Sequence, residues 1–161
     1  MKQDHVRSIL SPGSLHPILI VEDNDIDFRQ TIKAFKESHL GNPVYRCVDG
    51  DDALDFLHQR GKYSDPSTAP RPSIILLDLR MPGTDGKEVL REIKGNPDLR
   101  TIPVVVLTTS DAPVDVEACY AAGANSYVCK PVTFEGYLKA VRSLDEYWFH
   151  IAILPDVGEP Q

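Results

Sequence analysis

Five short apolar runs, each followed by a stretch with helical periodicity, constrain the fold of this chain more than any other feature. The runs are PILIV, PVYRCV, SIILL, PVVVL and SYVC, which begin at Pro17, Pro43, Ser73, Pro103 and Ser126. This alternation is typical of βαβ units around a parallel sheet. Because the runs are almost continuously apolar, we expect helices to cover both faces of the sheet. The sequence therefore predicts an α/β fold.

The stretches between and after the runs predict five helices, at about residues 26–40, 51–59, 86–95, 116–123 and 134–149. Five such repeats favour a doubly wound, five-stranded parallel sheet of the flavodoxin-like type, with strand order 2-1-3-4-5. Asp25 and Asp85 are expected to cap the first and third of these helices.

Composition limits the number of domains and the partners. A chain of 161 residues with 42% hydrophobic content is long enough for one domain with its own core. A net charge of −7 argues against a nucleic-acid partner, and no apolar stretch approaches the ~20 residues of a membrane span. Cys47, Cys119 and Cys129 are odd in number and lack metal-type spacing, and the amino-terminal segment lacks a secretory apolar core. A cytoplasmic location is therefore expected.

The domain is expected to span residues 17–149, with a flexible segment at 1–16 and an apolar tail at 150–161. The sequence YWFHIAILP near the tail is more apolar than an exposed helix end should be. The last helix already has a core-facing stripe of Phe134, Leu138, Val141, Leu144 and Trp148. Four other apolar residues then need a partner, either the same domain or a second copy in a homodimer. They are Phe149, Ile151, Ile153 and Leu154.

Polar side chains follow four of the five expected strands. Asp78 comes directly after the third strand and Lys130 after the fifth, while Glu22 and Asp23 follow the first. Thr108 and Thr109 follow the fourth. Because ligands of open parallel sheets bind beyond the carboxyl ends of the strands, these groups are expected to meet there.

Three carboxylates at one edge would raise each other's pKa values unless a cation lies among them. Mg²⁺ is a hard cation that binds one or two carboxylates together with phosphate oxygens, so it fits this edge. Phosphoryl transfer would then use Asp78 as a nucleophile that forms an acyl phosphate. Lys130 would neutralise the transferred group, and a threonine hydroxyl would donate a hydrogen bond to it.

Four motifs, VEDN, LLDLRMPGTDG, VVVLTTS and YVCKP, occur in an order and at spacings that together resemble the receiver domain of two-component response regulators. The resemblance extends from Ile18 to Leu144. It implies an acidic pair, a phosphoacceptor that also binds Mg²⁺, a main-chain Mg²⁺ ligand, a hydroxyl switch residue, an aromatic switch residue and a lysine. These correspond to Glu22 and Asp23, Asp78, the carbonyl of Arg80, Thr108, Tyr127 and Lys130. The family pattern also implies a cis peptide between Lys130 and Pro131.

Of the acidic pair, Asp23 is expected to be the direct Mg²⁺ ligand. Thr109 departs from the family pattern, because receivers often place a smaller residue there. Arg80 and Ser110 occupy positions that tune the phosphate lifetime in the family.

By this resemblance, the protein is expected to be a single-domain response regulator that accepts a phosphoryl group from a sensor histidine kinase. It would catalyse only its own phosphorylation and dephosphorylation, and would switch the surface formed by the fourth helix, the fifth strand and the fifth helix. The loop QRGKYSDPSTAPRP and the apolar tail are similar to those of response regulators paired with cyanobacterial-type phytochrome histidine kinases.

Two alternatives remain. A receiver-like interaction module that never turns over phosphate should have lost an acidic partner, the phosphoacceptor or the lysine, and none is missing. A hydrolase of the haloacid dehalogenase type would carry an acid two residues after Asp78, where Arg80 stands.

Overall fold

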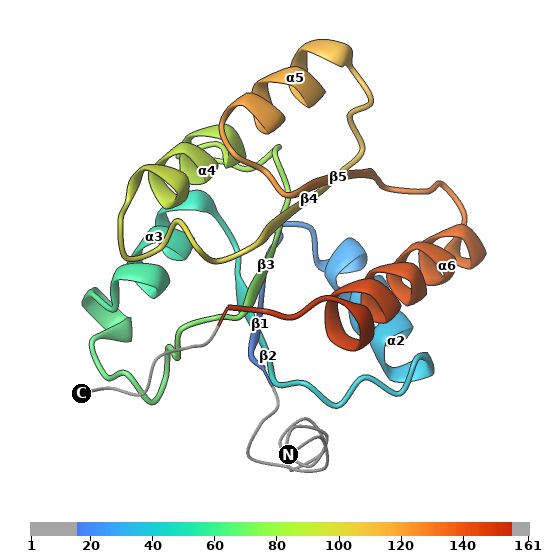
Figure 1. The fold of residues 1–161 in the computed structure, drawn as a ribbon, viewed down its shortest axis with the longest axis horizontal. Coiled ribbons are helices and arrows are strands. Elements are labelled where there is room, and N and C mark those ends of the chain that lie inside the picture. Colours follow the sequence, from blue (N-terminus) through green and yellow to red (C-terminus); the bar gives the residue numbers. More distant parts are fainter. Residues whose placement is uncertain (1–15, 156–161) are drawn as a thin grey trace.

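Five parallel strands form one sheet in the order β2-β1-β3-β4-β5, which confirms the expected topology (Figure 1). The computed structural model describes residues 16–155, and the expectations for residues 1–15 and 156–161 lie outside this range. The strands are β1 (Ile18–Val21), β2 (Val44–Cys47), β3 (Ile74–Leu77), β4 (Val104–Thr108) and β5 (Ser126–Cys129).

Helices cover both faces of the sheet, as Figure 1 shows. The helices α2 and α6 lie on one face, and α3, α4 and α5 lie on the other. Their bounds are α2 (Asp25–Glu37), α3 (Gly50–His58), α4 (Gly86–Gly95), α5 (Pro113–Ala121) and α6 (Phe134–Asp145). A short 3-10 turn (Gly61–Tyr63) lies in the loop after α3.

Alternate residues of each central strand supply two separate cores. In β1, Leu19 and Val21 face the core under α3, α4 and α5, whereas Ile18 and Ile20 face the core under α2 and α6. All four residues of β1 are buried, as are all four of β3. This double burial explains why the strands read as continuous apolar runs.

Three of the helix starts show where the sequence was right and where it was not. The side chain of Asp85 caps α4 by accepting the main-chain N–H of Glu88, as expected. In α2 the cap is Asn24 and not Asp25, because the Asn24 side chain accepts the first free N–H groups of the helix. Helix α5 begins three residues earlier than expected, at Pro113, whose fixed φ suits a first helical position.

The carboxyl-terminal helix also ends differently from the expectation. Helix α6 stops at Asp145, and a π-helical turn (Glu146–Ile151) continues it. Since a π turn is wider than an α turn, it changes which side chains face inward. Trp148 and Phe149 both pack against the core under α2 and α6, so Phe149 finds its partner in the same domain, the first of the two expected outcomes. Tyr147, Ile151 and Ile153 are exposed.

Every peptide bond in the described range 16–155 is trans. The cis bond implied for Lys130–Pro131 was therefore wrong, since the trans form is the lower-energy isomer even before proline. Within the same range, no helix combines the length and the apolar character that a membrane crossing requires.

Candidate functional site

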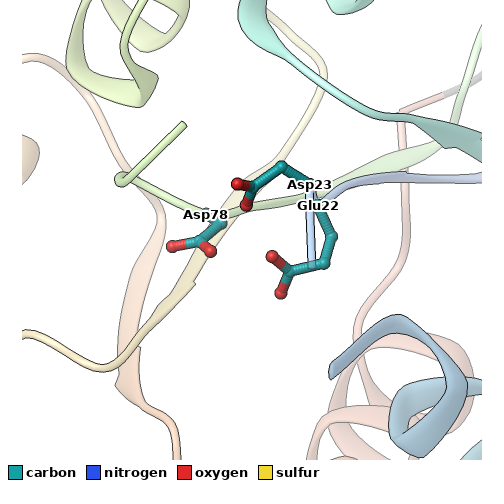
Figure 2. Close-up of side chains that lie close together, drawn as sticks. All are labelled: Glu22, Asp23 and Asp78. Carbon is teal, nitrogen blue, oxygen red and sulfur yellow. The ribbon is translucent and has the colours of Figure 1, made fainter. Parts of the chain in front are cut away.

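Two parallel strands deliver three carboxylates to the same edge of the sheet. Strands β1 and β3 pair in register up to Val21 and Leu77, and the N–H of Asp78 donates to the carbonyl of Val21 at 3.1 Å. Glu22 and Asp23 follow β1 just as Asp78 follows β3. One side-chain oxygen from each of these three acids lies within 4.8 Å of the others (Figure 2).

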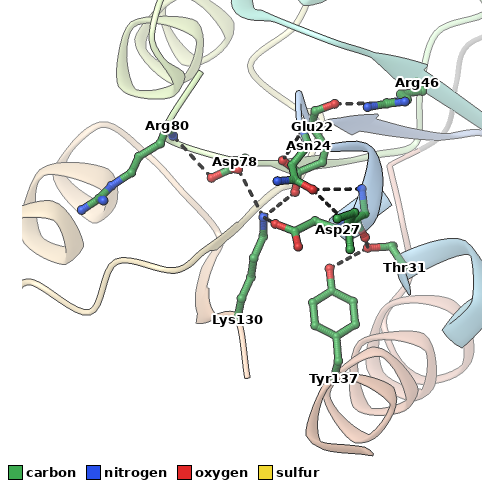
Figure 3. Close-up of polar contacts among 10 residues, drawn as sticks. Glu22, Asn24, Asp27, Thr31, Arg46, Asp78, Arg80, Lys130 and Tyr137 are labelled. Atoms are coloured by element: carbon green, nitrogen blue, oxygen red, sulfur yellow. Dashed lines mark hydrogen bonds and ion pairs between the residues drawn. The ribbon is translucent and has the colours of Figure 1, made fainter. Parts of the chain in front are cut away.

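Lys130 reaches this cluster from the end of β5. Its main-chain N–H donates to the Thr108 carbonyl at 2.6 Å, which continues the β4–β5 pairing. The ammonium Nζ donates to Glu22, to Asp27 Oδ2 at 2.9 Å and to Asp78 Oδ2 at 3.2 Å (Figure 3). Only 4% of the Lys130 side chain is exposed. The lysine is therefore a buried cation shared by three acids.

The electrostatics of the cluster follow from this burial. Burial of Glu22 and its hydrogen bond with Asp78 raise the pKa of Glu22 to about 8, despite the attraction of Lys130. Burial alone would lower the pKa of Lys130, but the hydrogen bond and charge of Glu22, together with Asp27 and Asp78, raise it above its usual value. One ammonium thus balances the acids only in part, and the site retains excess negative charge.

The donor set fits a magnesium ion. Glu22, Asp23 and Asp78 offer only carboxylate oxygens, which a hard divalent cation prefers. Asp23 is exposed, whereas Glu22 and Asp78 are buried, so the cluster opens to solvent on the side of Asp23. The N–H of Arg80 donates to Asp78 Oδ1 at 3.3 Å, which holds the Arg80 main chain beside the Asp78 carboxylate. The role of the Arg80 carbonyl as a metal ligand stays a prediction.

The two expected switch residues lie on β4 and β5. Thr108 is fully buried, and its hydroxyl has no hydrogen-bond partner among the described residues. Tyr127 is half-buried against the core under α3, α4 and α5, and its hydroxyl donates to the Ser110 carbonyl at 2.8 Å. Ser110 lies two residues after Thr108, so the aromatic ring is tied to the chain segment that carries the free hydroxyl.

Sequence reasoning missed two residues of this site. Asp27 lies in the first turn of α2 and contacts Lys130 directly. Arg46 of β2 donates from Nε to the Glu22 carbonyl at 3.1 Å and pairs with Asp25 at 2.8 Å. The one signal for Asp27 was its place in the first turn of the helix that follows the Glu22–Asp23 pair. No signal in the sequence pointed to Arg46.

Comparison with known families agrees with this geometry. Residues 18–142 match the response regulator receiver domain, so the chain belongs to that family. It is accordingly a phosphoaccepting regulator of two-component signalling. Among characterised relatives, it is 43% identical over 138 residues to the response regulator Rcp1 of Synechocystis sp., covering 86% of this chain and 92% of Rcp1.

Two solved structures show the same fold. The Mn²⁺-bound form of Rcp1 has a TM-score of 0.82 and 42% identity, covering 88% of this chain and 99% of that one. The phosphorylated cyanobacterial phytochrome response regulator RcpA has a TM-score of 0.83 and 39% identity, with the same coverage of both chains.

Proposed function

We propose that this protein takes a phosphoryl group from a sensor histidine kinase onto Asp78. The observation that carries the proposal is the position of Lys130, whose ammonium binds Asp78 inside a cluster of oxygen ligands suited to Mg²⁺. A carboxylate oxygen of Asp78 would form the new P–O bond while the P–N bond to the kinase histidine breaks. The imidazole nitrogen keeps the electron pair of that bond and takes a proton from solvent.

The residues of the site would have separate roles in this transfer. Glu22, Asp23 and Asp78, with the Arg80 carbonyl, would hold Mg²⁺, which neutralises negative charge on the reacting groups when it is bound. Lys130 would neutralise the transferred group from the carboxyl end of β5. The protein would catalyse only its own phosphorylation and dephosphorylation, and so would act as a signalling protein and not as an enzyme on other substrates.

Phosphorylation would act through Thr108 and Tyr127. The unpartnered Thr108 hydroxyl is a ready donor for the new phosphoryl oxygens. Its movement would shift Ser110 and break the bond from the Tyr127 hydroxyl, which frees the ring to rotate. The surface of α5, β5 and α6 would change as a result.

The partner of this chain is proposed to be a histidine kinase of the phytochrome type. The similarity to Rcp1 and to the phytochrome response regulator RcpA supports this pairing. A cytoplasmic location fits such a kinase partner. The receiver domain would span 17–149.

A homodimer built on the carboxyl-terminal residues is the second part of the proposal. Tyr147, Ile151 and Ile153 are exposed apolar side chains next to the end of α6. These residues, continuing into the tail at 150–161, would supply a self-complementary contact.

The proposed transfer is tested by the intact mass of the protein after incubation with acetyl phosphate, with and without Mg²⁺. The wild type should gain the mass of one phosphoryl group only with Mg²⁺, and Asp78→Asn should gain nothing. Asp85→Asn is a matched control, because Asp85 caps α4 a few residues away and asparagine is also a good cap. If the wild type gains nothing, the protein acts as a phosphate-independent interaction module. If Asp78→Asn still gains the group, the nucleophile is another residue.

A further inference from the structure

Lys130 has three hydrogen-bonding partners, and only two of them have a task in the proposed transfer. An ammonium group has three N–H donors, and here they go to Glu22, Asp27 and Asp78. Asp78 is the proposed nucleophile and Glu22 a proposed metal ligand. Asp27 has no such task, although its contact with Nζ, at 2.9 Å, is shorter than that of Asp78, at 3.2 Å.

The helix turn that carries Asp27 is held firmly from both sides. The side chain of Asn24 accepts the Asp27 N–H at 3.0 Å. Further along α2, the Thr31 hydroxyl donates to the Asp27 carbonyl at 3.0 Å and lies 2.6 Å from the hydroxyl of Tyr137 on α6. Thr31 and Tyr137 are both buried. Asp27 thus projects from a turn that is fixed to two neighbouring segments.

The Lys130 ammonium, in contrast, is not fixed by its own main chain and needs a contact with such a rigid turn. Its ammonium stands at the end of a flexible four-carbon stem, so a second fixed contact limits where the charge can go. Figure 3 shows the Lys130 ammonium between Asp78 on one side and Asp27 on the other. Catalytic groups are held in productive geometry by neighbours that do not react themselves.

We propose that Asp27 is a positioning residue, which holds the Lys130 ammonium against α2 so that its other two donors, to Glu22 and Asp78, stay where the incoming phosphoryl group would bind. This inference rests on the proposed function, because it assigns a partner to the lysine of that site. Asp27 touches neither the nucleophile nor the transferred group in this arrangement. It acts only through Lys130.

The test compares Asp27→Asn with Asp25→Asn in the full chain. Asp25 lies in the same turn of α2, is 68% exposed, and pairs with Arg46 and not with Lys130. At saturating acetyl phosphate and Mg²⁺, Asp27→Asn should lower the maximal rate of phosphorylation about 5-fold, the size expected for a partly exposed ion pair. The half-saturating Mg²⁺ concentration should stay unchanged, and Asp27→Glu should recover part of the rate. A maximal rate equal to that of Asp25→Asn, or a faster one, would overturn the proposal.

A second measurement keeps this proposal separate from the proposed function. In metal-free protein without a phosphodonor, the ¹⁵N resonance of the Lys130 ammonium should show slow proton exchange in the wild type and in Asp25→Asn. Asp27→Asn should accelerate that exchange. An unchanged Lys130 signal in Asp27→Asn would refute the positioning role, whether or not the wild type accepts phosphate.

Discussion

At the scale of single residues, Thr108 contributes a hydroxyl to the site that the described part of the fold leaves unpaired. The hydroxyl of Thr108 is buried and lacks a partner among the described residues. A buried polar group without a hydrogen bond lowers the stability of a fold. Its presence here therefore indicates that the hydroxyl is retained for function. In the proposed switch, this hydroxyl finds its partner only after phosphorylation.

Thr108→Val should therefore stabilise the resting protein while it blocks the switch. Valine has nearly the same shape, and it removes a hydroxyl that gains nothing in the resting state. We expect the free energy of unfolding to rise by about 1 kcal/mol, measured by urea denaturation without phosphodonor. Thr109→Val, at the exposed neighbouring position, is the control and should change the free energy of unfolding little. A loss of stability in Thr108→Val would mean that the hydroxyl is hydrogen-bonded in solution.

The residues of the site were predictable from the sequence where the strands themselves position them. Glu22, Asp78 and Lys130 each follow an apolar run, so their meeting at one edge follows from the parallel topology. Asp27 was not predicted, because whether a helix residue reaches a strand end depends on how α2 packs against the sheet. Arg46 was missed for a similar reason, since its target is a main-chain carbonyl that bears no sequence signature.

At the scale of elements, the start of α4 determines where the loop after β3 lies. Gly86 approaches this loop so closely that a Cβ atom would lie 2.3 Å from the Asp78 carbonyl oxygen and 2.6 Å from Leu79 Cα. Both are main-chain atoms and cannot swing away. The glycine thus lets α4 begin directly against the segment that carries Asp78.

Gly86→Ala should consequently displace this segment. We expect a loss of about 1–3 kcal/mol in the free energy of unfolding, together with weaker Mg²⁺ binding measured by calorimetric titration. Gly95→Ala is the matched control, because Gly95 ends the same helix and a Cβ atom there meets nothing within 4 Å. That variant should be neutral or stabilised by up to about 1 kcal/mol. Equal effects of the two substitutions would contradict the close-approach argument.

The elements themselves were largely predictable, and their ends were less so. The range 86–95 and the run SYVC agree with α4 and β5 residue for residue, because clear turn or cap signals bound them. The last helix was predicted through Phe149, since the apolar spacing continues past Asp145. The change to a π turn there leaves no mark in that spacing, because it depends on how Trp148 and Phe149 fit against the core.

At the scale of the whole molecule, the two ends of the α6 segment face different surroundings. Tyr137 and Val141 of α6 are buried, whereas Ile151 and Ile153, beyond the end of α6, are 65% and 92% exposed. Isolated exposed apolar residues are common, but Tyr147, Ile151 and Ile153 are three exposed apolar residues within seven positions, and the proposed dimer would cover them with a second copy. A two-fold pair would bring the same patch from each copy together.

The double substitution Ile151→Lys and Ile153→Lys should accordingly convert a dimer into a monomer. Two lysines on each copy would place four like charges in the proposed contact, and desolvating or opposing them disfavours association. Mass measured by light scattering over a range of protein concentrations would report the change. Ile26→Lys, an equally exposed apolar site on α2, is the control and should leave the mass at that of the dimer. If wild type is a monomer at all concentrations, or the double variant still dimerises, the contact does not lie at these residues, and the exposed isoleucines are not needed for self-association.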